Sequence, residues 1–211
     1  MSTVNKNINF YHNDISKDLL NHYKNSSYLA VDTEAMGLIH GRDRLCLVQI
    51  CNESNLTSCI KIEINTSSSP NLKILFEDEK IIKIFHYARF DVAALKCNLG
   101  INTKNIFCTK IASKLARTYT NKHGLKDLIN ELLGIELDKS SQSSDWGSKE
   151  DLTTEQLSYA ANDVRYLIEA MHKLKIILKR EGRNELAKKC FSAVPIYADL
   201  DILKFSNIFE H

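Results

Sequence analysis

The stretch Leu29-Ala-Val-Asp-Thr-Glu34 decides how this chain is expected to fold. Residues 28–31 form a short apolar run typical of a buried strand, and Asp32 and Glu34 follow two residues apart. Because side chains alternate between the two faces of a strand, these two carboxylates should project from the same side. The stretch therefore predicts a buried strand that carries an acidic pair at its end.

Two further segments carry acidic residues in positions that should bring them to the same place. In His86-Tyr-Ala-Arg-Phe-Asp91 the acid opens a helix directly after the predicted strand 81–85. In Tyr159-Ala-Ala-Asn-Asp163 the tyrosine and the acid lie four residues apart in a helical pattern, so they share one helix face. Each residue alone has an ordinary explanation as a turn residue, a solvated helix residue or a packing aromatic. Their joint occurrence in this order favours one acidic site.

Such a site predicts metal ions. Repulsion between the acids is costly unless cations neutralise them, and hard carboxylate oxygens suit Mg²⁺ or Mn²⁺. Two divalent ions about 3.5–4 Å apart clamp the attacking and leaving oxygens of an in-line displacement, which predicts phosphodiester hydrolysis. Tyr159 is expected to orient the attacking water, because a tyrosine with a pKa of about 10 is a poor base by itself. The predicted metal ligands and catalytic acids are Asp32, as the bridging ligand, with Glu34, Asp91 and Asp163.

The composition is that of an ordinary globular domain. The chain has 211 residues, of which 44% are apolar and 26% charged, and its net charge of +2 neither requires nor excludes nucleic acid. No apolar run approaches the ~20 residues of a membrane helix, and the first residues lack the basic and apolar segments of a signal peptide. The six cysteines form no C-x-x-C pair. We therefore expect one cytoplasmic domain over residues 1–211, with free thiols and no membrane contact.

The predicted elements give an α/β order. Strands are expected at 28–32, 45–51, 60–64, 81–85 and 107–109. The strand 60–64 alternates between apolar and polar residues, which favours a half-buried antiparallel position. Helices are expected after residue 70, after residue 86, at 110–117, at 125–133, and from a capping box at Thr153 to Gly182. Three antiparallel strands followed by a crossover to parallel strands predict a mixed, ribonuclease-H-like sheet flanked by helices.

The three acidic segments together resemble the tyrosine-bearing (DEDDy) branch of the DEDD 3′→5′ exonucleases. Within that branch, motifs similar to the ribonuclease D family are Phe85-His-Tyr-Ala-Arg-Phe-Asp91, Ser144-Asp-Trp146 and Tyr159-Ala-Ala-Asn-Asp-Val-Arg-Tyr-Leu167. Segments similar to the nano-RNase C group, compact bacterial enzymes that consist of the exonuclease domain alone, include Phe107-Cys-Thr-Lys-Ile-Ala-Ser-Lys-Leu115 and Arg117-Thr-Tyr-Thr120. The similarity runs from about residue 10 to residue 209.

The resemblance implies a metal-dependent 3′→5′ exoribonuclease that uses two Mg²⁺ or Mn²⁺ ions and releases nucleoside 5′-monophosphates. The chain ends soon after the exonuclease domain, so we expect no C-terminal helical RNA-binding modules. This favours short single-stranded RNA, including dinucleotides, as substrate. Two alternatives remain open. A proofreading-type DNA 3′→5′ exonuclease uses the same carboxylates, although no polymerase is attached here. A non-catalytic nucleic-acid-binding module would not need all four acids and the tyrosine.

Five residues are candidates for substrate binding: Thr33, Leu38, His86, Lys139 and Trp146. Leu38 is expected to wedge against the terminal base and His86 to contact the terminal nucleotide. Lys139 and Trp146 lie in a long polar loop, residues 135–151, of a length typical of functional loops. There the lysine can contact phosphate and the tryptophan can anchor the loop. Packing or surface roles remain alternatives for these side chains.

The resemblance also implies assembly. It points to a closed, ring-shaped homo-oligomer, an octamer, with active sites that face a central channel, and closed symmetry is usual for soluble homo-oligomers. Residues 194–209 hold many apolar side chains for the end of a chain. They pack either back onto their own domain or against another subunit. Arg42 and Arg44 could contact either the substrate or another subunit, and the sequence does not decide between these roles.

Overall fold

A mixed sheet forms the centre of the molecule. The computed structural model describes residues 8–137 and 144–209, and within them the sheet has the order β1-β4-β3-β2-β5-β6. The strands are β1 Ile8–His12, β2 Tyr28–Ala35, β3 Leu45–Asn52, β4 Thr57–Lys61, β5 Ile82–Phe85 and β6 Ile106–Cys108. Strands β2, β3 and β4 are antiparallel, whereas β5 and β6 continue from β2 in parallel. The predicted sheet of three antiparallel strands followed by parallel strands is confirmed.

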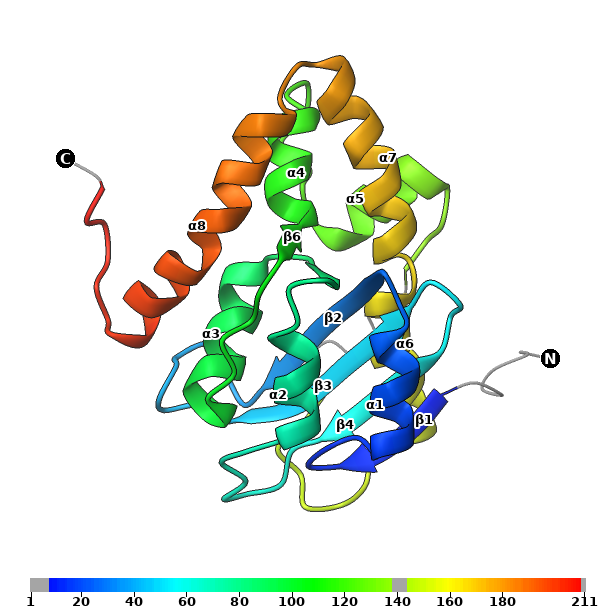
Figure 1. Cartoon of the computed structure of the whole chain (residues 1–211), viewed down its shortest axis with the longest axis vertical. Coiled ribbons are helices and arrows are strands. Elements are labelled where there is room, and N and C mark those ends of the chain that lie inside the picture. The colour runs from blue at the N-terminus through cyan, green and yellow to red at the C-terminus, as the bar shows by residue number, and fades with distance from the viewer. Residues whose placement is uncertain (1–7, 138–143, 210–211) are drawn as a thin grey trace.

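Helices cover both faces of this sheet. They are α1 Lys17–Lys24, α2 Pro70–Phe76, α3 Ala88–Leu99, α4 Thr109–Ala116, α5 Leu125–Leu133, α6 Thr154–Arg165, α7 Leu167–Arg180 and α8 Asn184–Ile202. In Figure 1, α1, α2 and α3 lie on the near face and α6 passes behind the strands, where it contacts β2, β3 and β4. Helices α4, α5 and α7 gather at one end of the sheet, and α8 runs from that end down beside α3 (Figure 1).

The core lies between these layers and explains why the central strands read as continuous apolar runs. Every residue of β3 is buried, as are Leu29, Ala30 and Val31 of β2. A strand covered by helices on both faces has no solvated side, so apolar and polar residues do not alternate along it. The charged side chains of β2, Asp32 and Glu34, follow these buried residues, where the strand is only half-buried.

The third predicted strand was placed wrongly. The structure has β4 at Thr57–Lys61 instead of 60–64, and all five of its residues are buried instead of alternating. The reason is β1, which was not predicted and which pairs in parallel with β4, so that β4 is an interior strand. Helix α1 was not predicted either, although Ser16 provides its N-cap by accepting from the backbone N–H of Leu19.

The last predicted helix is two helices. The capping box is present, because the Thr153 hydroxyl accepts from the Gln156 backbone and the Gln156 side chain accepts from the Thr153 backbone. However, α6 ends before Tyr166 and α7 starts after it, whereas one helix was expected up to Gly182. Within the described ranges of the chain, no helix is both long and apolar enough to span a bilayer.

Candidate active site

Strand β2 and helix α6 bring three carboxylates together. Asp32 and Glu34 alternate with Thr33 along β2, so both acids lie on one face of the strand, as predicted from their spacing. Asp163 is in the third turn of α6, which packs against β2. One carboxylate oxygen from each of Asp32, Glu34 and Asp163 lies within 4.8 Å of the other two. Two segments more than a hundred residues apart thus form a group of three acids that could hold a metal ion.

Asp91 approaches the same place from α3. Its carboxylate is buried and accepts a hydrogen bond of 2.7 Å from the Thr33 hydroxyl. Thr33 thus binds the fourth acid from the strand face opposite Asp32 and Glu34. The charge of Asp91 is one cause of the raised pKa values of both β2 acids, so it belongs to the same electrostatic cluster. Among the described residues it is not one of the three whose oxygens lie within 4.8 Å of one another.

The pKa values show how unfavourable this cluster is without a cation. Burial, followed by the charges of the neighbouring acids, raises the pKa of Asp32 well above its usual value and that of Glu34 to about 8. Burial also raises the pKa of Asp91 to about 7, against the hydrogen bond from Thr33, which lowers it. Desolvation and like charges both disfavour a carboxylate anion. A divalent cation coordinated by these oxygens would relieve both effects, so the donor set fits Mg²⁺ or Mn²⁺.

Tyr159 stands one helical turn before Asp163 and hydrogen-bonds to its side chain. Burial and the negative charge of Asp163 raise the pKa of the phenol above its usual value, so the hydroxyl stays protonated and donates. The ring is packed against Trp146, with centroids 6.1 Å apart. Trp146 is only 5% exposed and does not line the cavity that holds the acids. Its position is that of a packing partner for Tyr159.

His86 directly follows β5, and one of its two ring nitrogens has a hydrogen-bond partner. Its Nδ1 atom is 2.9 Å from the Thr109 hydroxyl, which itself donates to the Phe85 carbonyl. Burial lowers the pKa of His86 to about 3, although the backbone of His123 favours the charged form. The imidazole is therefore neutral at physiological pH. Its Nε2 atom is buried and has no hydrogen-bond partner among the described residues.

One cavity of about 330 Å³ joins most of these groups. Its wall includes the three clustered acids, Thr33, His86 and Tyr159. It also includes two lysines that the sequence did not single out, Lys110 at the start of α4 and Lys126 at the start of α5. The Lys110 amine lies 4.4 Å from the centre of the Tyr87 ring. Nothing in the sequence indicates that α4 and α5 bring these two lysines to the wall of the cavity that holds the acids.

Two other residues predicted to contact substrate, Leu38 and Lys139, are not on the wall of this cavity as described. Leu38 is 80% exposed, which excludes core packing within this chain, and it borders a separate groove that includes Tyr87 and Arg89. Lys139 lies outside the described residues. Arg44 is used structurally, since its guanidinium donates to the carbonyls of Ile62 and Gly147. Arg42 is exposed and pairs with Asp43.

One solved structure that this chain matches is described as the apo form of a nuclease, with a TM-score of 0.93 and 43% identity over 98% of this chain and 100% of that chain. A structure described as Brucella melitensis NrnC bound to pGG matches with a TM-score of 0.92 and 43% identity, over 98% of this chain and 100% of that chain. The same Brucella protein has been solved with bound Mg²⁺, and that structure matches with a TM-score of 0.91 and 42% identity over 97% of this chain and 99% of that one. A relative with so similar a fold thus binds the cation that the acidic cluster here suits.

Curated relatives agree at the level of sequence. Ribonuclease D from Sphingobium indicum is 32% identical over 160 residues, which are 76% of this chain and 41% of the relative. DNA polymerase I from Aquifex aeolicus is 37% identical over 175 residues, which are 82% of this chain and 28% of the relative. The chain thus spans well under half the length of these relatives. The sequence pattern of the 3′–5′ exonuclease family matches residues 7–179, and the chain belongs to that family.

Proposed function

We propose that this protein is a metal-dependent 3′→5′ exoribonuclease that degrades short single-stranded RNA, including dinucleotides, to nucleoside 5′-monophosphates. The observation that carries the proposal is the group of three carboxylates within 4.8 Å of one another in a chain of the 3′–5′ exonuclease family. We further propose that it acts in the cytoplasm, where short RNA fragments are its substrates.

In this proposal the acids hold two divalent cations. Asp32, Glu34 and Asp163 would supply the ligand oxygens, and Asp91, fixed by the Thr33 hydroxyl, would complete the set. The bound cations supply charge neutralisation at the phosphate and a more acidic water. Tyr159 stays protonated, so its hydroxyl orients the water by a hydrogen bond instead of removing a proton. These side chains come from three elements, β2, α3 and α6, so the site depends on how those elements pack together.

The remaining groups of the cavity suit an RNA end. Lys110 and Lys126 would bind the phosphate next to the scissile bond, since a lysine amine is a compact phosphate-binding charge. His86, on the cavity wall, would contact the terminal nucleotide. The exposed Leu38 would stack against a base. The Brucella relative solved with pGG supports a short substrate for this chain too.

A DNA 3′→5′ exonuclease is the second candidate, and the similarity to DNA polymerase I favours it. The test is release of mononucleotide from a 5′-labelled RNA dinucleotide, a long RNA and a DNA strand, each with Mg²⁺, with Mn²⁺ and with chelator. The proposal expects metal-dependent turnover that is fastest on the dinucleotide. Preferential turnover of the DNA strand would favour the second candidate. Absence of metal-dependent release from every substrate would overturn both and leave a nucleic-acid-binding module.

We also propose that the chain assembles into a ring-shaped homo-oligomer, an octamer, with active sites that face a central channel. The support is a set of exposed apolar side chains at the end of the chain, namely Ile196, Leu203, Phe205, Ile208 and Phe209. Several large exposed apolar side chains so close together in the chain are typical of a segment that another protein surface covers. A ring would admit only flexible ends, which would favour short substrates.

A further inference from the structure

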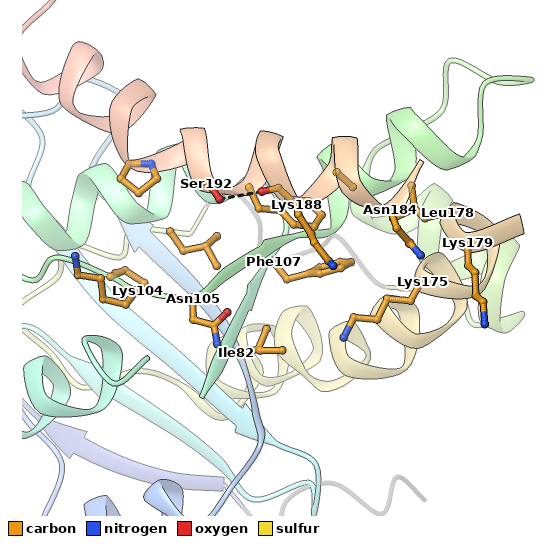
Figure 2. Close-up of a pocket in the computed structure, with 15 residues that line it drawn as sticks. Ile82, Lys104, Asn105, Phe107, Lys175, Leu178, Lys179, Asn184, Lys188 and Ser192 are labelled. Atoms are coloured by element: carbon orange, nitrogen blue, oxygen red, sulfur yellow. Dashed lines mark hydrogen bonds between the residues drawn. The ribbon is translucent and has the colours of Figure 1, made fainter. Parts of the chain in front are cut away.

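A second cavity, larger than the catalytic one, lies between β6, α7 and α8 (Figure 2). Its volume is about 660 Å³, and it shares no lining residue with the cavity that holds the acids. None of the functional residues discussed above contributes to its wall. Cavities of roughly 300–1,000 Å³ are the usual size for small-molecule sites, so this one has room for a ligand larger than a simple ion.

The wall of this cavity is positively charged. Its charged lining residues are all lysines: Lys104, Lys175, Lys179 and Lys188. Figure 2 shows the side chain of Lys188 extending from α8 toward Phe107. The amines of Lys104 and Lys179 point away from that ring, so Lys175 and Lys188 are the lysines that serve the cavity. Lys188 pairs with Glu185 at 2.8 Å, but both side chains are largely exposed, so the pair contributes little and a phosphate can replace the carboxylate. The cavity therefore favours an anion.

Helix α8 adds to this preference. It begins at Asn184, on the wall of the cavity, and its N-terminus has no side-chain cap. The first N–H groups of a helix have no partner within the helix and carry a partial positive charge, so they favour a phosphate group. The helix terminus and the lysines thus act in the same direction.

The same cavity offers aromatic surface beside the charge. Phe107 of β6 and Phe191 of α8 stand with their ring centroids 4.6 Å apart, and Ile82 and Leu178 extend the apolar wall. The Lys175 amine is 5.6 Å from the centre of the Phe107 ring. A planar base can pack on such rings while its phosphate reaches the lysines. An inorganic anion alone would leave this apolar surface unused.

A buried hydroxyl on the wall lacks a partner. Thr103 is 3% exposed, and its Oγ1 atom makes no hydrogen bond with any described residue. Buried polar groups are normally hydrogen-bonded, and leaving one unpaired is costly. Thr103 lines this cavity, but its Oγ1 atom is itself covered, so a ligand would reach this hydroxyl only after the wall shifts.

We propose that this cavity is a binding site for a nucleoside monophosphate, separate from the catalytic site. Lys175, Lys188 and the start of α8 would bind the phosphate, and Phe107 and Phe191 would contact the base. The site does not depend on the hydrolysis proposed above, because it uses none of the acids and requires no metal ion.

The experiment is calorimetric titration of the full chain with AMP in the presence of a chelator. Lys110→Gln combined with Lys126→Gln removes the lysines of the acidic cavity and should keep the affinity for AMP, which separates heat at the second site from heat at the acidic cavity. Lys175→Gln and Lys188→Gln should each weaken AMP binding about tenfold. Lys173→Gln is the matched control, since Lys173 is on the same helix, exposed and absent from the cavity wall. It should leave the affinity unchanged.

A second variant tests the space instead of the charge. Ser192→Phe should fill the cavity and abolish AMP binding, while thermal melting shows that α8 remains folded, because the Ser192 hydroxyl donates only to the Lys188 carbonyl within the helix. Absence of AMP binding by the wild-type chain would overturn the proposal. So would an equal loss in Lys173→Gln, equally tight binding of inorganic phosphate, or tighter binding of a short oligonucleotide than of AMP.

Discussion

Loss of one carboxylate from the acidic cluster should stop hydrolysis without unfolding the protein. Asp32→Ala and Asp163→Ala each remove an oxygen ligand from a group in which like charges already raise the pKa values. The metal-free variants should therefore melt at the same temperature as the wild type or higher, because repulsion is reduced. Thermal melting and dinucleotide turnover measured on the same samples check this. A variant with retained turnover would refute the metal assignment.

The hydroxyl of Tyr159 should matter more for turnover than for binding. Tyr159→Phe keeps the ring against Trp146 but removes the hydrogen bond to Asp163. We expect turnover to fall on the order of 10²-fold, because the water loses its orienting group, while the affinity for a dinucleotide in Ca²⁺ stays unchanged. Tyr166→Phe, which changes a tyrosine just beyond α6, is the control and should keep full turnover. Near-normal turnover of Tyr159→Phe would make the tyrosine structural.

The metal-free protein should lose stability as the pH rises from 6.5 to 8. The pKa values of Glu34 and Asp91 are about 8 and about 7 in the folded state and about 4 in an unfolded chain. The folded state therefore binds more protons across this window, and the free energy of unfolding falls with rising pH. His86, with a pKa of about 3 in the folded state and about 6.5 in an unfolded chain, acts in the opposite sense near pH 6.5 and is largely neutral in both states near pH 8. Thermal melting in chelator at a series of pH values measures how steeply the stability falls with pH.

Two comparisons isolate the cause of that slope. Glu34→Gln removes one titrating group and should flatten it. Addition of Mn²⁺ should restore the melting temperature more at pH 8 than at pH 6.5, because the ionised carboxylates are the ligands. A wild-type slope that is unchanged in Glu34→Gln and insensitive to Mn²⁺ would show that the cluster does not control it.

Single residues show which parts of the site a sequence can reveal. The two-residue spacing of Asp32 and Glu34 and the four-residue spacing of Tyr159 and Asp163 follow from strand and helix geometry, so the clustered acids were predictable. Lys110 and Lys126 were not, because periodicity tells which face of a helix a residue occupies and not which other element that face meets.

At the level of elements, the sequence predicts a strand wrongly where its burial depends on residues far away in the chain. The pattern of 60–64 predicted alternating exposure, but pairing with β1 made β4 an interior strand. The described end of the long polar loop, residues 144–151, is likewise held by side chains from distant strands. The Lys61 amine donates to the carbonyls of Lys149 and Glu150, and Arg44 donates to that of Gly147. A cation that satisfies backbone carbonyls far along the chain leaves no local sequence signal.

The connection between α4 and α5 depends on one buried cation. The Arg117 side chain is fully buried, donates to Glu131 of α5 at 2.9 Å and also binds Ser113 and the Lys122 carbonyl. Glu131→Ala should destabilise the protein by about 1–2 kcal/mol, because the buried guanidinium loses its counter-ion, while the 39% exposure of the Glu131 side chain lets water screen part of that charge. Glu136→Ala, at an exposed acid of the following segment, should have little effect. Chemical denaturation measures both, and equal stabilities would refute the role of Arg117.

At the scale of the whole molecule, helix α8 is anchored along its inner side and exposed at its end. Arg89 and Lys96 of α3 form ion pairs with Asp201 and Asp199 of α8. Beyond that anchor, the apolar side chains of the tail find few partners within the chain, and Phe209 stays 67% exposed although its ring contacts Tyr197. The tail therefore does not pack back fully onto its own domain, which leaves a subunit contact as the better explanation.

If the tail forms that contact, charge in it should break the assembly. Wild-type protein should scatter light with a mass several times the 24.1 kDa of one chain. Phe205→Asp combined with Ile208→Asp should reduce the mass to 24.1 kDa, because two buried carboxylates without partners cannot be accommodated in an apolar interface. Ile176→Asp, at an equally exposed apolar residue of α7, is the control and should leave the mass unchanged. A wild-type mass of one chain at micromolar concentration would reject the ring, and a double variant that still assembles would place the contact elsewhere on the surface.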